Sequence, residues 1–419
     1  MSSPLLAPFQ GWLIRPEWAE RVIASATDSK TPEQRRGVVE GNPFSYLGVT
    51  RSPEDLSPEC DIDELVALST GTFRQILSAD AFKPSDHAAF YVYRMSSSGD
   101  GRSQEPFSQI GIVGALDIEG LHDGRVLTHE NVRPERASLL TDHLNSVGAT
   151  SSPISLTHVA MPELQQLLTA ASMATPDIDV VTEGIRNQVW TLGTEETSSI
   201  QPLLEDLELF VTDGHHRCAA AIGARNAHQG NISFSRTLAV LFPHDHLRVE
   251  AFHRRAPDSA RRSTAELVAA LQAVGTISAV DSAWAAQPRS RGEVGVYHQG
   301  CWFRLRLDPP DSSSTLASLD VERLRVEVIG RVLGVDELRE DSDIDYVPAP
   351  TGVKELTARC DTDGFVGLLV YPTDITDIMA VAASGELMPP KSSFLYPKAP
   401  AGVFLQVFGV GATDHLSPS

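Results

Sequence analysis

The strongest constraint on the fold is the stretch of residues 210–221, where an apolar run changes within a few residues into an alanine-rich one. Upstream, residues 207–211 are mostly apolar and short enough for a buried strand. Downstream, residues 218–227 are rich in alanine and contain no proline, which predicts a helix. Between them, Asp213-Gly214 is a turn signal, because glycine allows the backbone to approach closely. The stretch therefore predicts a strand that turns sharply into a helix.

Such a turn suits an anion. The first N–H groups of a helix have no partner within the helix, and together with the helix dipole they attract phosphate. His215, His216 and Arg217 add donors in the first turn, and an arginine can hold a phosphate or carboxylate by two parallel hydrogen bonds. The alternative is an ordinary capped turn. Two histidines and an arginine in succession favour the anion site, because capping does not require them.

Composition limits the classes of function. The chain has 419 residues and a formal net charge of -21, which favours two or three domains and argues against a nucleic-acid partner. Its four cysteines are widely spaced and predict free thiols without a structural zinc site. We find no signal peptide and no apolar run of membrane-spanning length. The expectation is a cytoplasmic protein with no membrane partner.

The pattern of apolar residues along the chain predicts a mixed α/β fold of the α+β kind. Residues 89–94 and 109–118 are expected to pair as strands, and residues 292–297 and 301–307 to form a hairpin. We also expect a strand at residues 44–49. A further helix, at residues 321–333, is expected to end at Gly334.

A change in character near residue 257 divides the sequence into three parts. Residues 1–256 are expected to form an N-terminal α/β region around the turn. Residues 257–345 are expected to form an inserted α/β subdomain. Residues 346–419 are expected to be a C-terminal segment that returns to the active site.

A second candidate site lies near the C-terminus. Of the five lysines in the chain, Lys391 and Lys398 fall within one short segment. Lys391 follows two prolines and precedes Ser392 and Ser393, so a point charge and two hydroxyls lie on a stiff backbone. The segment is not a Walker A loop, since the glycines are missing. The alternative is an ordinary surface loop.

The third candidate is His129-Glu130, which could supply a base or a metal-bound carboxylate. The alternative is a cap at the start of a helix. The second histidine of a zincin motif is missing, and no G-x-S-x-G elbow occurs. Zinc chemistry and a Ser/His/Asp hydrolase are therefore poorly supported.

The order of these motifs resembles that of the DUF1015 family over nearly the whole chain. The motifs that carry the resemblance are Gly41-Asn42-Pro43, His129-Glu130, Thr212-Asp213-Gly214-His215-His216-Arg217, His253-Arg254, Leu319-Asp320-Val321, Leu333-Gly334-Val335, Met388-Pro389-Pro390-Lys391-Ser392-Ser393-Phe394 and Tyr396-Pro397-Lys398. The Asp-Gly-His-His-Arg block also looks like the signature of the ParB/sulfiredoxin-like fold, whose members place this turn against nucleotide phosphates.

The resemblance implies a ParB/sulfiredoxin-like core with an additional α/β domain. Free serine kinases of that superfamily phosphorylate the hydroxyl of free serine, and DUF1015 proteins are linked with serine metabolism. The implied function is a nucleotide-dependent kinase for free serine or a related hydroxy amino acid, with ATP or ADP as donor and Mg²⁺ as cofactor. One departure is that Ala26-Thr27-Asp28 stands where related sequences carry Pro-Tyr-Asp, which leaves the acceptor open.

The resemblance also implies roles for individual residues. The expected phosphate-binding residues are Gly214, His215, His216, Arg217, Lys391, Ser392, Ser393 and Lys398. Asp213 or Glu130 is expected to hold Mg²⁺ or to take the acceptor's proton, with Asp28 as a third candidate base and His216 as a donor to the leaving oxygen. Further expected site residues are His129, Asn42, His253 and Arg254.

Two other functions stay open. One is a ParB-like nucleotide-binding switch that transfers no phosphoryl group to a small molecule, and a homodimer would suit it. The other is a sulfiredoxin-like enzyme that uses Cys218, although this thiol follows the turn on the helix and is expected to pack in the core.

Overall fold

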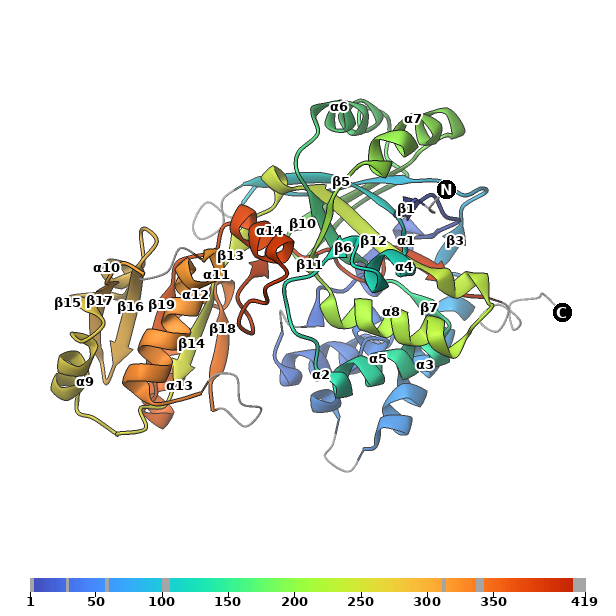
Figure 1. Cartoon of the computed structure of the whole chain (residues 1–419). Helices are drawn as coiled ribbons and strands as arrows, with labels where there is room; N and C mark the ends of the chain where they lie inside the picture. The colour runs from blue at the N-terminus through green and yellow to red at the C-terminus, as the bar shows by residue number, and fades with distance from the viewer. Residues whose placement is uncertain are drawn as a thin grey trace. The chain divides into compact units, whose positions relative to one another are not determined.

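The chain divides into two compact units in a computed structural model, which describes residues 4–27, 30–56, 60–99, 106–310, 314–336 and 343–409 (Figure 1). The larger unit comprises residues 1–128, 132–247 and 397–419, and the smaller unit comprises residues 129–131 and 248–396. The chain therefore passes between the units four times. Both units combine helices with sheets, which confirms the predicted mixed α/β class.

The larger unit is built on a mixed sheet in the order β6-β11-β8-β12-β5-β4-β10-β9, with β1 paired to β5. The strands β4 and β5 are antiparallel neighbours, as the sequence predicts. β11 runs parallel to β6 and antiparallel to β8. The bounds are β1 Leu6–Ala7, β4 Tyr91–Ser97, β5 Phe107–Asp117, β6 Val126–Leu127, β8 Ile154–His158, β9 Ile178–Thr182, β10 Ile185–Thr191, β11 Leu209–Asp213 and β12 Arg236–Pro243.

Helices cover both faces of this sheet (Figure 1). In Figure 1, α6 and α7 lie on one side of it, and α3, α5 and α8 lie on the other. The bounds are α1 Pro16–Val22, α2 Pro32–Gly41, α3 Ile62–Ser78, α4 Ile118–His122, α5 Pro134–Val147, α6 Pro162–Ala171, α7 Thr194–Glu205 and α8 His215–Ala227. A smaller sheet has the order β3-β2-β21-β7, with β2 Trp12–Ile14, β3 Phe82–Pro84, β7 Ala149–Thr150 and β21 Phe404–Val407.

The smaller unit has an antiparallel sheet in the order β15-β17-β16-β19-β14-β18. The hairpin of β16 and β17 confirms the predicted pairing. The strand bounds are β13 Val249–Glu250, β14 Phe252–Ala256, β15 Gly275–Val280, β16 Glu293–His298, β17 Cys301–Leu307, β18 Asp345–Pro348, β19 Val366–Val370 and β20 Phe394–Leu395. The helices are α9 Thr264–Leu271, α10 Ala283–Ala286, α11 Thr315–Ser318, α12 Asp320–Arg323, the π-helix η6 Leu324–Leu333, α13 Val353–Asp363 and α14 Ile375–Ser384.

The strand predicted at residues 44–49 is wrong. The chain forms a 3-10 turn there, η2 Tyr46–Gly48, and the Ser45 hydroxyl accepts a hydrogen bond from the N–H of Leu47 at 3.4 Å. The N–H groups of Gly48 and Val49 bond to carbonyls three residues earlier, so they form no ladder. Tyr46 and Leu47 are buried in this turn, and the sequence pattern reflects their burial rather than a sheet.

No helix in the described part of the chain combines the length and the apolar character that crossing a membrane requires.

The helix that carries the turn, α8, packs closely against α5. The hydroxyl of Thr141 on α5 lies 3.4 Å from the carbonyl of Ala220 on α8. A Cβ added at Gly223 would lie 2.6 Å from the Thr141 hydroxyl oxygen and 3.1 Å from its methyl carbon. Gly223 therefore allows the two helices to approach, and this contact sets where α8 lies.

We expect Gly223→Ala to lower the free energy of unfolding by about 1–2 kcal/mol, because the new methyl group overpacks the contact with Thr141. The matched control is Gly71→Ala in the middle of α3, where an added Cβ meets nothing within 4 Å. That variant should gain about 0.5–1 kcal/mol from helix propensity. Urea unfolding of both variants is the measurement, and equal stabilisation of both would contradict the close contact.

Candidate functional site

The predicted strand–turn–helix is present. β11 ends at Asp213, Gly214 has a left-handed backbone with φ of 102°, and α8 begins directly at His215, earlier than the predicted start at residue 218. A Cβ added at Gly214 would lie 3.0 Å from the guanidinium atoms of Arg217. The glycine therefore permits the positive φ and also lets the Arg217 side chain fold back over the turn.

The Asp213 carboxylate is held between two cations. Lys398 donates to its Oδ1 at 2.7 Å, and Arg217 donates to its Oδ2 and also to the carbonyl oxygen of Pro153. The side chains of Asp213, Arg217 and Lys398 are 22%, 28% and 13% exposed, so each keeps part of its surface in contact with solvent. With two positive charges against one negative charge at the start of α8, the group carries a net charge of +1 and suits an anion.

Burial alone would raise the pKa of the Asp213 carboxyl. The nearby charges of Lys398 and Arg217 outweigh burial and hold this pKa well below its usual range. Asp213 is therefore ionised at neutral pH and fixes both cations in place.

The two histidines of the motif have different environments. Nε2 of His216 accepts the backbone N–H of Arg133 at 3.1 Å, so the proton of a neutral ring lies on Nδ1. Arg133 is the N-cap residue of α5, and His216 thereby connects the starts of α5 and α8. His215 is 4% exposed, so its ring packs within the turn. A hydrogen bond from the His216 ring to a ligand would have to come from Nδ1.

In the smaller unit, two of the predicted motifs lie side by side. The N–H of Met388 donates to the carbonyl of His129 at 2.8 Å, and Glu130 pairs with Met388 in a parallel bridge. The His129-Glu130 motif therefore lies next to the start of the Pro-Pro-Lys-Ser segment, although the two are far apart in the sequence. Sequence spacing gave no sign of this pairing.

The loop after Met388 places its lysine outward and its first serine inward. Lys391 is exposed with φ of 55°, and its ammonium nitrogen lies 5.3 Å from the centre of the Phe252 ring. Ser392 is 5% exposed and its hydroxyl donates to the carbonyl of Pro389 at 2.7 Å, so this hydroxyl shapes the loop. Ser393 is half-buried.

On β14, His253 and Arg254 are both buried. Nδ1 of His253 accepts the N–H of Val370 at 3.3 Å. Burial, with a smaller contribution from the charge of Arg254, lowers the pKa of His253 to about 4. The His253 ring is therefore neutral at physiological pH and serves the packing of the sheet.

Two predicted residues belong to the N-terminal region. Asn42 donates to the carbonyl of Arg21 at 2.7 Å and accepts the N–H of Phe44 at 3.2 Å, so its side chain fixes the end of α2. Asp28 lies outside the described residues.

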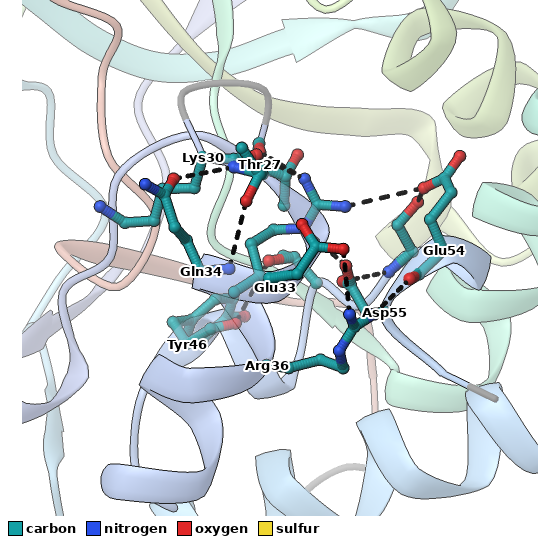
Figure 2. A network of polar contacts seen from close by, with 12 residues as sticks. Thr27, Lys30, Glu33, Gln34, Arg36, Tyr46, Glu54 and Asp55 are labelled. Carbon is teal, nitrogen blue, oxygen red and sulfur yellow. Dashed lines mark hydrogen bonds and ion pairs between the residues drawn. The ribbon is translucent and has the colours of Figure 1, made fainter. Parts of the chain in front are cut away.

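The chain on either side of position 28 is held by the polar network in Figure 2, which includes Thr27, Lys30 and Asp55. Its centre is the buried Arg35, whose guanidinium donates to Asp55 at 2.6 Å and to the carbonyls of Thr27 and Lys30 at 2.9 and 2.8 Å. The backbone that leads to and from position 28 is thus anchored to α2.

The turn does not fit a directly bound metal ion. Both carboxylate oxygens of Asp213 accept hydrogen bonds from protein cations, whose positive charges beside the carboxylate oppose the binding of a metal ion. Among the described residues, no group of three or more His, Cys, Asp or Glu side chains gathers in a way that could hold a metal. The role of Glu130 as a metal ligand stays a prediction.

Comparison with known proteins gives the family. The DUF1015 family, described as a protein of unknown function, matches residues 6–322. The chain belongs to the DUF1015 family. A search of curated proteins finds no match. The ParB/sulfiredoxin-like resemblance of this DUF1015 protein stays a prediction.

Solved structures similar to this DUF1015 protein are distant. A mutant free serine kinase in complex with ADP is 14% identical, with 71% of this chain and 92% of that chain covered and a TM-score of 0.34. SbnI with a C-terminal truncation, from Staphylococcus aureus, is 11% identical, with 68% and 83% covered and a TM-score of 0.37. A conserved hypothetical protein from Pyrococcus furiosus is 12% identical, with 68% and 90% covered and a TM-score of 0.33.

The Lys398–Asp213 ion pair predicts a pH-dependent stability. We expect Lys398→Met to lower the free energy of unfolding at pH 7 by about 1–3 kcal/mol, because Asp213 loses a charged partner. The folded pKa of Asp213 lies below its unfolded value of about 3.9, so the stabilisation is present above that pH and is lost as the pH falls below it.

Urea unfolding between pH 7 and pH 3 measures this difference between wild type and variant. Lys354→Met, on the exposed first turn of α13, is the control and should change stability by less than about 0.5 kcal/mol. A difference for Lys398→Met that stays constant down to pH 3 would show that Lys398 stabilises by packing alone.

Cysteine reactivity distinguishes the sulfiredoxin-like alternative. Burial raises the pKa of the Cys218 thiol to about 12, and that of Cys360 to about 11, whereas Cys301 is exposed. We expect iodoacetamide to modify Cys301 in the folded protein and to modify Cys218 only after denaturation. Peptide mass spectrometry gives the order of modification. Rapid modification of Cys218 in the folded protein would restore the alternative.

Proposed function

We propose that this DUF1015 protein is a nucleotide-dependent phosphotransferase that acts on the hydroxyl group of a small molecule. One observation carries the proposal, namely the net positive group of Asp213, Arg217 and Lys398 at the start of α8. Phosphoryl transfer depends on positioning and on neutralising negative charge more than on covalent chemistry. A fixed pair of cations at a helix start can both position a phosphate and neutralise its negative charge.

In this proposal, the turn binds the nucleotide phosphates. Asp213 holds Arg217 and Lys398 in place before the ligand arrives, so little reorganisation is needed when negative charge develops. His216, whose Nε2 accepts the Arg133 N–H, keeps the role expected from the sequence as a donor to the leaving oxygen. The expected role of Lys391 and Ser393 as donors to the transferred group stays a prediction from the sequence.

In this proposal Asp213 is not the base that takes the proton of the acceptor hydroxyl. Its low pKa makes Asp213 a weak base at neutral pH, and its oxygens accept from Arg217 and Lys398. Glu130 and Asp28 stay the candidates for the base that the sequence offers. Mg²⁺ would supply further charge neutralisation with the nucleotide. The resemblance of the motifs favours free serine or a related hydroxy amino acid as the acceptor.

The test is incubation of the protein with ATP or ADP, Mg²⁺ and a panel of hydroxy amino acids, with mass spectrometry of the products. We expect a phosphorylated amino acid from the wild type. Arg217→Ala should reduce kcat/KM about 10²–10³-fold, because it removes a donor to the developing charge. The matched control is Arg225→Ala on the last turn of the same helix, where the arginine pairs with Glu119.

The control should keep activity within about threefold, since Arg225 lies at the opposite end of α8 from the turn. Binding of nucleotide without any phosphorylated product would contradict the transferase and support the nucleotide-binding switch. Equal activity of Arg217→Ala and wild type would contradict the role of the turn.

A further inference from the structure

The strand β14 carries two adjacent arginines that are both buried. Successive residues of a strand point to opposite faces, so the two side chains lie on different sides of the sheet. Arg255 pairs with the carboxylates of Asp345, at 2.5 Å, and of Asp363. Arg254 is 0% exposed, and its guanidinium donates to the carbonyls of Phe252 and Pro390. Arg255 therefore forms ion pairs with carboxylates, whereas Arg254 bonds to backbone carbonyls.

The Pro390 carbonyl belongs to the residue before Lys391. Lys391 has φ of 55°, in the left-handed region, which is unfavourable for a residue other than glycine. Such a conformation persists only when the surroundings impose it. The contacts that hold this loop therefore also determine the position of the Lys391 ammonium group.

Hydrogen bonds on both sides of Lys391 impose the conformation. The Ser392 hydroxyl donates to the carbonyl of Pro389 at 2.7 Å, and the Thr373 hydroxyl donates to the carbonyl of Ser392 at 3.3 Å. Nη2 of Arg254 donates to the carbonyl of Pro390 at 3.2 Å. Of these donors, only the guanidinium comes from the central sheet of the smaller unit.

Arg254 also bonds to Phe252, the residue whose ring lies beside the Lys391 ammonium group. Nη1 of Arg254 donates to the carbonyl of Phe252, and the Lys391 ammonium group lies over the Phe252 ring, 5.3 Å from its centre. One buried guanidinium therefore connects the backbone of the loop with the residue on which its lysine rests.

We propose that Arg254 is a positioning residue that fixes the loop of residues 389–392 and so places the Lys391 ammonium group for contact with a phosphoryl group. The part that concerns the phosphoryl group rests on the proposed function. The part that concerns the loop does not, and the two can be tested separately.

The first experiment measures loop opening without any substrate. Endoproteinase Lys-C cleaves after lysine, and the chain has only five, namely Lys30, Lys83, Lys354, Lys391 and Lys398. We expect Arg254→Lys to raise the rate of cleavage after Lys391 about tenfold relative to cleavage after Lys354, because the loop opens more easily. Arg254→Gln, which keeps a donor without the charge, is the second variant in case the first does not fold.

The matched control is Arg255→Lys, which changes the next residue on the same strand and weakens ion pairs on the other face, because an ammonium group lacks the fork with which the guanidinium bonds to both carboxylates. It should leave the relative cleavage after Lys391 within about twofold of wild type, although the protein is less stable. Cleavage that is unchanged in both Arg254 variants, or raised equally in Arg255→Lys, would overturn the positioning role.

The second experiment measures turnover with nucleotide and hydroxy amino acid. Arg254→Lys should impair the same kinetic parameter as Lys391→Ala, and the double variant should be no worse than Lys391→Ala. A double variant whose losses multiply would overturn the action of Arg254 through Lys391. If cleavage changes as expected but no protein, wild type included, phosphorylates any acceptor, the positioning role stands and the proposed function fails.

Discussion

A single carboxylate with two cationic partners connects three segments of the larger unit. Asp213 ends β11, Arg217 belongs to the first turn of α8, and Lys398 comes from the segment that leads to β21. Hydrogen bonds to charged groups contribute about 1.5–3 kcal/mol each. The same bonds that stabilise the fold therefore also fix two positive charges beside a helix start.

Residues of this turn also bond to both segments with which the chain returns to the larger unit. The chain re-enters at residue 132 and at residue 397. Directly after the first entry, the N–H of Arg133 bonds to His216, and directly after the second, Lys398 pairs with Asp213. The residues that we propose to bind phosphates are thus the ones that anchor both returning segments.

Local features were predictable from the sequence because neighbouring residues determine them. The start of α2 is one such feature, since Thr31 and Gln34 form a capping box there and Pro32 is the first helical residue. Gly334 ends η6 with φ of 72°, as its position after an apolar helix suggested. The edge strand β15 was missed, because several of its residues are exposed and it lacks an apolar pattern.

The contacts of the candidate site were not predictable in this way. Asp213 and Lys398 are 185 positions apart, and only the folded topology brings them together. Sequence reasoning identified both residues but assigned them separate roles, Asp213 as a metal ligand or base and Lys398 as a phosphate-binding residue. Burial likewise determines that the Ser392 hydroxyl bonds to its own loop, while the adjacent Ser393 is half-buried.

The tripeptide His129-Glu130-Asn131 has a consequence for how this protein can be divided. It belongs to the smaller unit, yet the rest of that unit is one continuous stretch from residue 248 to residue 396. Excising that stretch with two cuts would leave Met388 without the backbone carbonyl that its N–H contacts, directly before the Pro-Pro-Lys turn. The smaller unit is therefore not a self-sufficient module, since a remote part of the chain supplies one of its pieces.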